Sequence, residues 1–323
     1  MKEMKVAFIG AGDISNLHAE AVANVAGATL KGLWNRTREK AEAKAAEFGC
    51  EVYDSPEALC ADPEIDAVFV MTNMETHRDY AVMALEAGKH VLVEKPTAST
   101  IEEIEDIKAA SEKSGKQCMP VHNYIYEDSV RRARQLLDEG KLGDLVSVYV
   151  LYNIHHPEEV AARYPGVIRQ ILTHHSYILL YLAGKPVSVS AMKATVNDGS
   201  VPQENLAMAT LTMENGALAH LCASFANDDH AGDPWTCMIK VIGTKGATRY
   251  SYRDWVENTP AVVHSQTYSA YPYTIRQTAE YFLEDVVGKG AAPLSSIDDA
   301  ITCQRIIEGC EASVAEGRHV KLD

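Results

Sequence analysis

Hydrophobic and polar positions follow two different rhythms along this chain of 323 residues. Before about residue 121, short apolar runs alternate with stretches in which apolar residues recur at helical spacing. Strands that alternate with helices form βαβ units, so this half predicts a parallel, doubly wound sheet covered on both faces. The predicted strands are 5–10, 29–34, 66–71, 90–95 and 116–121, and the helices are 36–49, 76–89 and 99–115.

Signals at the ends of elements sharpen two of these predictions. In the helix over 99–115, Ser99 and Glu102 have the spacing of a capping box, and Gly115 stands where the helix would end. A glycine pair, Gly10 and Gly12, follows the first strand at once and precedes a helical stretch.

The rhythm changes to strict alternation after about residue 145, which is typical of half-buried strands. Asn215-Gly216 between two such strands predicts a hairpin, because both residues accept the positive φ of its turn. We therefore expect a C-terminal α+β domain with a large, mostly antiparallel open sheet. Its alternating runs are 145–154, 205–213, 216–225 and 236–243, followed by a closing helix at about 296–316.

Composition narrows the possible partners. The formal net charge of −15 argues against nucleic acid, which requires a basic face. No apolar stretch reaches the ~18 residues typical of a membrane span, so no membrane partner is expected. The seven cysteines lack any C-x-x-C pair, and the N-terminus runs directly into a strand, so we expect a cytoplasmic protein without a signal peptide.

The glycine pair is the first chemical signal. Glycines at a strand–turn–helix junction let backbone amides approach a pyrophosphate at the helix start, as in dinucleotide-binding domains. Ser15 replaces the third glycine of the usual fingerprint and is small enough to pack near the strand. A structural turn in another α/β domain is the alternative. The expected cofactor contacts here are Gly10, Gly12, Asp13 and Ile14.

The end of the second strand lacks the carboxylate that usually holds the ribose hydroxyls of NAD. Asn35 can form a hydrogen bond with a ribose, and Arg36 and Arg38 can meet a 2′-phosphate. The sequence therefore predicts NAD(P) as cofactor with a lean toward NADP. Two solvated arginines at a helix start remain the alternative.

Glu94, Lys95 and Pro96 stand directly after the buried strand 90–93. Ligands of doubly wound sheets bind outside the carboxyl ends of the strands, so Lys95 is expected beside the reactive end of the cofactor. A lysine there can exchange the proton of a substrate hydroxyl, with a pKa lowered by desolvation. Glu94 would orient the amine and Pro96 would fix the backbone, through a cis bond if one forms.

Four segments together resemble the glucose–fructose oxidoreductase/inositol dehydrogenase/MocA family, and the resemblance extends over the chain. They are "GAGDIS" with a following His, "TNMETHRDYAVMALEAGKHVLVEKP", "EGKLGDLVSV" and "GRHVKL". The resemblance implies a Rossmann domain at 1–122, a substrate and oligomerisation domain at 123–323 and a bound NAD(P). It also implies that Lys95 is the site lysine. By the same match, Thr72, Asn73 and His77 line the cofactor side of the cleft, where Glu94 is a further cofactor candidate. Asn123 begins the crossover into the second domain and is a substrate candidate.

The resemblance also implies an Asp and a His four residues apart on a helix of the second domain. Here these positions are Gln170 and His174. His174 is then expected to share acid–base work with Lys95, whereas Gln170 can only position substrate by hydrogen bonds. Tyr124, with Tyr126, stands where many members have an Arg, which predicts an aromatic entrance suited to a neutral sugar ring.

Histidines and aromatic residues later in the chain complete the candidate site. We predict no metal centre, because the histidine cluster lacks the cysteine or carboxylate spacing of a zinc site. Three of these histidines meeting as zinc ligands is the alternative. The remaining substrate candidates are His155, His156, Arg163, His175 and Trp235.

These signals predict an NAD(P)-dependent oxidoreductase that transfers a hydride between nicotinamide and a sugar, polyol or related carbohydrate. One alternative is a redox-neutral glycosidase or isomerase that oxidises its substrate transiently. Another is a non-catalytic cofactor-binding regulator. The open sheet predicts a homodimer or homotetramer, because an exposed apolar sheet face favours a partner.

Overall fold

A computed structural model describes residues 3–154, 156, 161–196, 203–226, 235–251 and 267–322. The chain divides into two compact units. The first consists of Met1–Tyr126 and Pro272–Ile301, and the second of Glu127–Tyr271 and Thr302–Asp323. The segment 272–301, which the sequence pattern assigned to the second half, thus belongs to the first unit.

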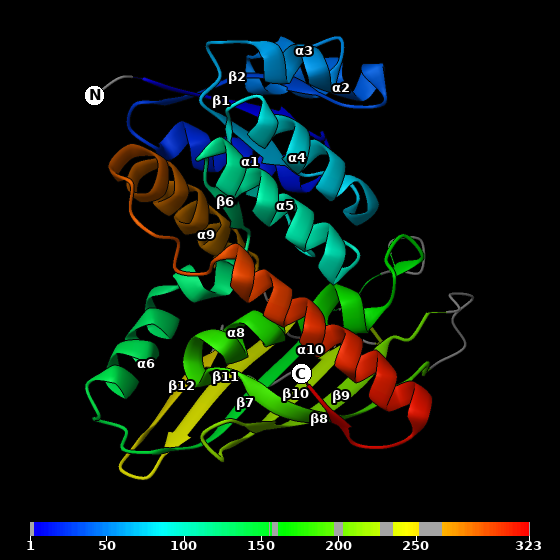
Figure 1. The fold of residues 1–323 in the computed structure, drawn as a ribbon, viewed down its shortest axis with the longest axis vertical. Helices are drawn as coiled ribbons and strands as arrows, with labels where there is room; N and C mark the ends of the chain where they lie inside the picture. Colours follow the sequence, from blue (N-terminus) through cyan, green and yellow to red (C-terminus); the bar gives the residue numbers. More distant parts are fainter. Residues whose placement is uncertain are drawn as a thin grey trace, which may run out of the picture. The chain divides into compact units, whose positions relative to one another are not determined.

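The first unit contains a six-stranded parallel sheet of order β3-β2-β1-β4-β5-β6 (Figure 1). The predicted doubly wound sheet is therefore confirmed. The strand order reverses between β1 and β4, which is where such sheets bind ligands. The strands are β1 (Met4–Ile9), β2 (Ala28–Trp34), β3 (Glu51–Val52), β4 (Ala67–Val70), β5 (His90–Val93) and β6 (Cys118–Pro120).

Both faces of this sheet are apolar, because every residue of β4 and most of β1 and β5 is buried. Side chains of α4 and α5 pack on one face in a common core with β1, β4 and β5. On the other face Phe8 and Phe69 stack at 5.4 Å. The helices of this unit include α1 (Ile14–Asn24), α2 (Arg38–Phe48), α3 (Pro56–Ala61), α4 (His77–Glu86) and α5 (Ile101–Ser114).

The capping signals of α5 are confirmed at one end and displaced at the other. Gly115 ends the helix with φ +67°, as predicted. The N-cap, however, is Thr100 and not Ser99: the Thr100 side chain accepts from the Glu103 amide, and the Glu103 carboxylate accepts from the Ser99 amide. The box is thus shifted by one residue, because Thr100 has the extended backbone that a cap requires.

The segment 272–301 belongs to the first unit because its apolar residues are buried there. It includes the end of α9 (Thr267–Glu280) and the π-helix η4 (Tyr281–Val287). Phe282 packs against Phe69 of β4 with ring centroids 5.9 Å apart. Thr274 accepts a 2.6 Å hydrogen bond from the buried Asn123 amide. The polar–apolar pattern of this segment alone carries no sign of which unit it joins.

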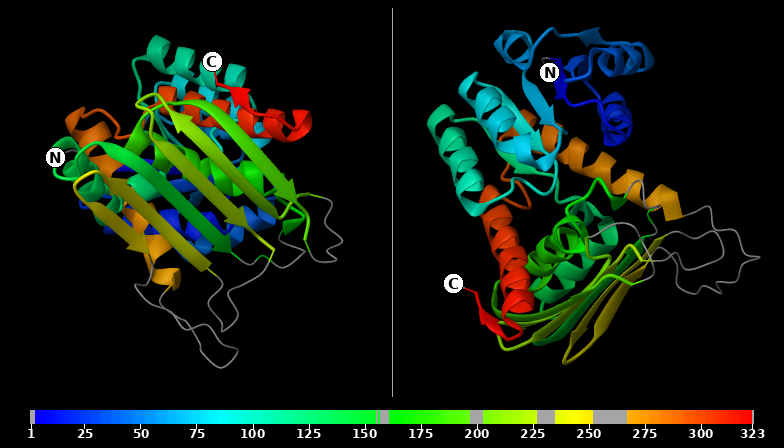
Figure 2. Two further views of the ribbon diagram at one scale, coloured as in Figure 1. Left: turned by 90° about the horizontal axis from the view of Figure 1, so that it is seen from below. Right: turned by 90° about the vertical axis from the view of Figure 1, so that its right-hand side faces the viewer.

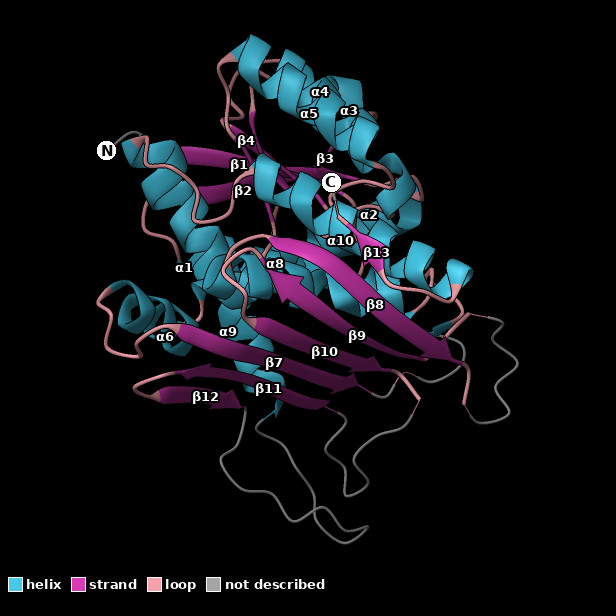
Figure 3. Ribbon diagram, turned by 60° about the horizontal axis from the view of Figure 1, so that its bottom comes forward, coloured by secondary structure: helices cyan, strands magenta, loops and turns pink. Residues whose placement is uncertain are grey.

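The second unit contains a seven-stranded sheet of order β12-β11-β7-β10-β9-β8-β13 (Figure 3). All neighbours are antiparallel except β7 and β10, so the predicted mostly antiparallel sheet is confirmed. The predicted hairpin joins β9 and β10, with Gly216 at φ +82°. The strands are β7 (Leu145–Ile154), β8 (Pro186–Ala194), β9 (Leu206–Met213), β10 (Leu218–Ser224), β11 (Trp235–Gly243), β12 (Ala247–Ser251) and β13 (Val320–Lys321).

Helices cover one face of this sheet. The alternating residues Val148 and Val150 of β7 and Ile239 of β11 are buried beneath them. The opposite face is drawn without a described helix of the same unit in front of it (Figure 2, left). The helical segments of this unit include α6 (Asp128–Asp138), the π-helix η3 (Ile168–Leu172), α8 (Thr173–Ala183) and most of α10 (Ile297–Glu316), which confirms the predicted closing helix.

No helix among the described residues is both long and apolar enough to cross a membrane.

Candidate functional site

The glycine turn after β1 is shaped on one side by protein and on the other by open space. Gly10 has φ +115°, and a Cβ there would lie 2.6 Å from the Met71 carbonyl oxygen, so only glycine fits. At Gly12 a Cβ would meet no atom within 4 Å. Helix α1 begins at Ile14 after its N-cap Asp13, and its first turn holds no acidic residue. The turn therefore leaves room for an anionic group at a positive helix end.

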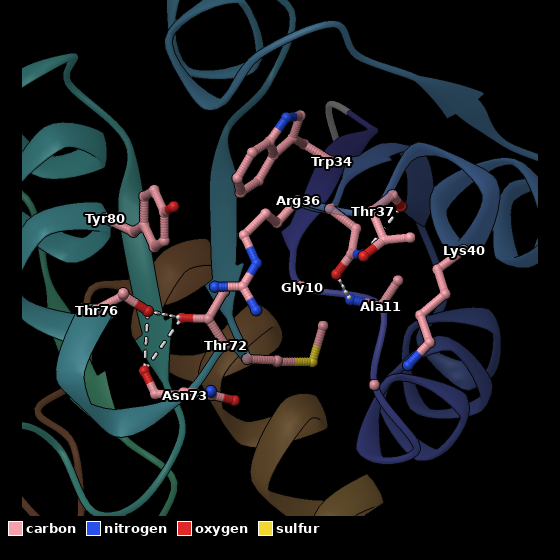
Figure 4. Close-up of a pocket in the computed structure, with 13 residues that line it drawn as sticks. Gly10, Ala11, Trp34, Arg36, Thr37, Lys40, Thr72, Asn73, Thr76 and Tyr80 are labelled. Atoms are coloured by element: carbon pink, nitrogen blue, oxygen red, sulfur yellow. Dashed lines mark hydrogen bonds between the residues drawn. The ribbon is translucent and has the colours of Figure 1, made fainter.

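This turn forms one wall of a hollow at the carboxyl ends of β1, β2 and β4 (Figure 4). That is the position in which doubly wound sheets bind dinucleotides. The hollow is lined by Gly10, Ala11, Gly12, Trp34, Asn35, Arg36, Thr37, Lys40, Met71, Thr72, Asn73, Thr76 and Tyr80. The predicted positions Asp13 and Ile14 lie just beyond it, where α1 begins.

Asn35 ties two walls of the hollow together. Its Oδ1 accepts a 3.2 Å hydrogen bond from the Ala11 amide, and its Nδ2 donates at 3.0 Å to the Thr37 carbonyl. The residue predicted to contact a ribose therefore also holds the glycine turn against the loop after β2.

The cations near this loop differ in their partners. Arg38 forms ion pairs with Glu42 at 2.8 Å and Asp54 at 2.7 Å and does not line the hollow. Arg36 and Lys40 do line it, and neither has a hydrogen bond or ion pair to the described residues. In Figure 4 the Arg36 guanidinium projects into the hollow. Sequence reasoning missed Lys40, whose only signal is its place in the first turn after the second strand.

The wall opposite the glycine turn comes from the loop after β4 and the start of α4. The Thr76 hydroxyl donates to the Thr72 hydroxyl at 2.8 Å, and Asn73 lies between them in the chain. Above them the rings of Trp34 and Tyr80 lie 5.6 Å apart. Thr72 and Asn73 were expected here, whereas Thr76, Trp34 and Tyr80 carry no distinctive motif.

His77 joins this loop to the Lys95-Pro96 segment. Its side chain is 1% exposed, with Nδ1 2.8 Å from the Pro96 carbonyl oxygen and Nε2 2.9 Å from the Thr72 carbonyl oxygen. Burial lowers the pKa of this imidazole despite both carbonyls. His77 does not line the hollow itself, but its contacts hold in place the loop after β4, whose residues do.

Lys95 lies two residues after the end of β5, and its bond to Pro96 is cis. Burial lowers the pKa of the Lys95 amine to about 8, against the opposing charge of Glu94. Burial is the largest influence on the Glu94 carboxyl and would raise its pKa, but the hydrogen bond and charge of His18, with the charge and backbone amide of Lys95, together lower it. The negative charge of Glu94 thus acts on an amine that can exchange a proton near neutrality.

Gln170 and His174 belong to a continuous helical segment of the second unit. Gln170 lies in the π-helix η3, a kind of turn often found at functional sites, and His174 lies in the first turn of α8. His174 is buried, with Nδ1 2.6 Å from the Tyr177 hydroxyl. The start of η3 is fixed by Glu204, whose carboxylate accepts from the Ile168 amide at 3.2 Å.

Other predicted substrate residues of the second unit fall into different settings. His175 is 1% exposed, and burial lowers its pKa to about 3. His156 packs against Phe225 at 4.8 Å and Tyr164 at 5.3 Å. Arg163 is exposed in the loop before η3. His155 and the side chain of Trp235 lie outside the described residues.

The segment predicted as an aromatic entrance is instead interior. Asn123 and Tyr124 are 0% exposed and Tyr126 is 1% exposed. The Tyr126 hydroxyl donates to the Met119 sulfur at 3.3 Å, and its ring packs 5.3 Å from that of Tyr281. These side chains are buried because the 3₁₀-helix η2 (Asn123–Tyr126) turns them inward at the end of the first unit's N-terminal segment.

No group of three or more His, Cys, Asp or Glu side chains in the described part of the chain is arranged to hold a metal ion.

Comparison with known families agrees with this geometry. Residues 4–122 match the model of an oxidoreductase family with an NAD-binding Rossmann fold, and residues 130–249 match the GFO/IDH/MocA C-terminal domain. The chain belongs to the glucose–fructose oxidoreductase/inositol dehydrogenase/MocA family. The resemblance inferred from the motifs is thereby confirmed, and so are the family's two-domain α/β fold and its NAD-binding first domain.

Members similar to this chain differ in the substrates that their names give. An inositol 2-dehydrogenase of Rhizobium meliloti (strain 1021) is 26% identical, covering 99% of this chain and 99% of its own length. A 4-carboxy-2-hydroxymuconate-6-semialdehyde dehydrogenase of Sphingobium sp. (strain NBRC 103272 / SYK-6) is also 26% identical, covering 96% and 99%. The crystal structure of scyllo-inositol dehydrogenase from Lactobacillus casei, with NAD(H) and scyllo-inositol, shares the fold (TM-score 0.87, 19% identity, 99% of each chain).

Proposed function

We propose that this protein is a dehydrogenase or reductase that transfers a hydride between a nicotinamide cofactor and a sugar, polyol or related carbohydrate. The observation that carries the proposal is Lys95 at the carboxyl end of β5, with its pKa lowered to about 8 next to Glu94. The names of relatives that act on inositol and D-apiose support the substrate class.

The residues of the hollow fit such a cofactor. The open space before Gly12 suits a pyrophosphate, and Arg36 and Lys40 suit a 2′-phosphate, which supports NADP over NAD. A bound nicotinamide supplies the hydride acceptor or donor. Lys95 then exchanges the proton of the reacting hydroxyl, His174 assists it, and Gln170 orients the substrate by hydrogen bonds.

The test is nicotinamide absorbance with a panel of sugars, polyols and sugar acids, both cofactors supplied and products analysed in parallel. Net cofactor turnover is expected, and Lys95→Met should lower kcat by about 10²–10⁴-fold, as loss of a general acid–base does. Product without net turnover would replace the proposal with a redox-neutral reaction. Full turnover by Lys95→Met would remove Lys95 from the chemistry.

We also infer a homo-oligomer formed through the open face of the second sheet. One cross-strand row on that face is almost wholly apolar, and Met192 and Met208 in it are 74% and 41% exposed. Apolar surface of this kind is stabilised by a second copy of the same face. The row consists of Met192, Met208, Cys222, Leu151 and Met238.

A further inference from the structure

The Glu94 carboxylate is buried, and each of its oxygens has a defined partner. Oε1 lies 2.9 Å from Nε2 of His18, and Oε2 accepts a 3.0 Å hydrogen bond from the Lys95 amide. Glu94 is 7% exposed. A carboxylate removed from water to this degree stays ionised only where donors and positive charge replace its hydration. For Glu94 the His18 hydrogen bond is the largest influence that lowers the pKa, and the charge and backbone amide of Lys95 act in the same direction.

His18 projects from α1 into the interior and is 0% exposed. Its ring meets Phe69 edge-on at 5.5 Å. The other ring nitrogen, Nδ1, has no hydrogen bond to the described residues. A proton on Nδ1 would therefore be a buried donor without an acceptor, whereas a proton on Nε2 is used by Glu94. The contacts favour an imidazole that donates from Nε2 to Glu94.

We propose that His18 is a positioning residue: its Nε2–H bond keeps the Glu94 carboxylate ionised in the interior, and this carboxylate in turn keeps a proton on the Lys95 amine. His18 of α1 thus acts on the Lys95 amine indirectly, through the Glu94 carboxylate. The effect on turnover rests on the function proposed above, but the charge relation of the three residues does not.

Other titratable groups at this edge of the first unit do not replace His18. His77 from α4 contacts the Pro96 and Thr72 carbonyls, and burial lowers its pKa. His122, after β6, contacts the Ser295 hydroxyl at 2.5 Å, and burial lowers its pKa to about 3. Both are neutral where Lys95 titrates. The carboxylate of Glu75 also acts on His77, from the 3₁₀-helix η1 (Met74–Thr76).

The test measures the charge of Lys95 directly in the cofactor-free protein. Acetic anhydride labels the neutral amine, and mass spectrometry of the Lys95 peptide gives the pH at which labelling is half-maximal, with Lys95→Met as the blank. This midpoint is expected near pH 8 in the unmodified chain. Glu94→Gln removes the adjacent negative charge and should lower it by about 1–3 pH units.

Two His18 variants separate the hydrogen bond from simple packing. His18→Gln places an amide donor near the position of Nε2 and should keep the midpoint of the unmodified chain. His18→Leu fills the space without a donor and should lower the midpoint in the direction of Glu94→Gln. His18→Asn, whose shorter amide cannot reach Glu94, replaces His18→Leu if the latter gives no cooperative thermal unfolding.

Three results would overturn the proposal. The labelling midpoint could be unchanged in His18→Leu or His18→Asn, it could fall in His18→Gln as far as in these variants, or it could be unchanged in Glu94→Gln. The pH profile of kcat/KM should move with the labelling midpoint. The His18 variants could shift the labelling midpoint of Lys95 in a protein that turns over no carbohydrate. That result would support the role of His18 and contradict only the proposed function.

Discussion

Arg36 and Lys40 lie in the same short segment as Arg38, yet only the first two line the cofactor hollow. Arg38 is already neutralised by Glu42 and Asp54, so its charge is not available to a phosphate in the same way. We therefore propose that the preference between NADP and NAD depends on Arg36 and Lys40, which have no carboxylate partner among the described residues.

Replacing Arg36 or Lys40 by Ala should weaken NADP more than NAD. A charged hydrogen bond contributes about 1.5–3 kcal/mol, so we expect the KM for NADP to rise roughly tenfold to a hundredfold, with little change for NAD. Steady-state kinetics with both cofactors measures this. Lys44→Ala is the matched control, because Lys44 lies on α2, as Lys40 does, and forms an ion pair with Glu47. Equal effects on NAD and NADP would contradict a 2′-phosphate contact.

At the scale of elements, the strand–turn–helix junction of β1 and α1 combines two glycines with different tasks. Gly10 is required by the fold, because its φ is +115° and the Met71 backbone leaves no room for a Cβ. Gly12 has no positive φ, and a Cβ there would meet no atom within 4 Å, so the fold by itself would accept a side chain. We propose that the cofactor occupies the space that Gly12 leaves open.

Gly10→Ala should therefore lower the stability of the fold, whereas Gly12→Ala should weaken cofactor binding. Gly10→Ala should lower the free energy of unfolding by about 1–3 kcal/mol, the usual cost of a strained backbone conformation, or more because of the clash. Gly12→Ala should leave it unchanged or raise it by up to about 1 kcal/mol. Its cofactor Kd, however, should rise about tenfold or more, since the Cβ blocks the pyrophosphate. Denaturant unfolding and fluorescence titration separate the two. If Gly12→Ala bound the cofactor as tightly as the unmodified protein, the pyrophosphate would not lie against Gly12.

At the scale of the whole molecule, the open sheet of the second unit bears on assembly. Met208→Lys puts a charge between Met192 and Cys222 in the apolar row, where a second copy would have to desolvate it. We expect a smaller particle by light scattering coupled to size-exclusion chromatography, with unchanged thermal unfolding of the monomer. Ala46→Lys, on the exposed surface of α2, is the control. An unchanged mass in Met208→Lys would exclude this face as the interface.

The sequence by itself determined the features that depend on a few consecutive residues. These are the buried strands, the hairpin at Asn215-Gly216, the glycine turn and the place of Lys95 at the end of β5. Local periodicity and turn chemistry suffice for these. Tertiary structure alone decided that Tyr124 and Tyr126 are buried and that residues 272–301 join the first unit. It also decided that His18 meets Glu94, 76 positions away. Such contacts depend on how distant segments pack, which no local pattern encodes.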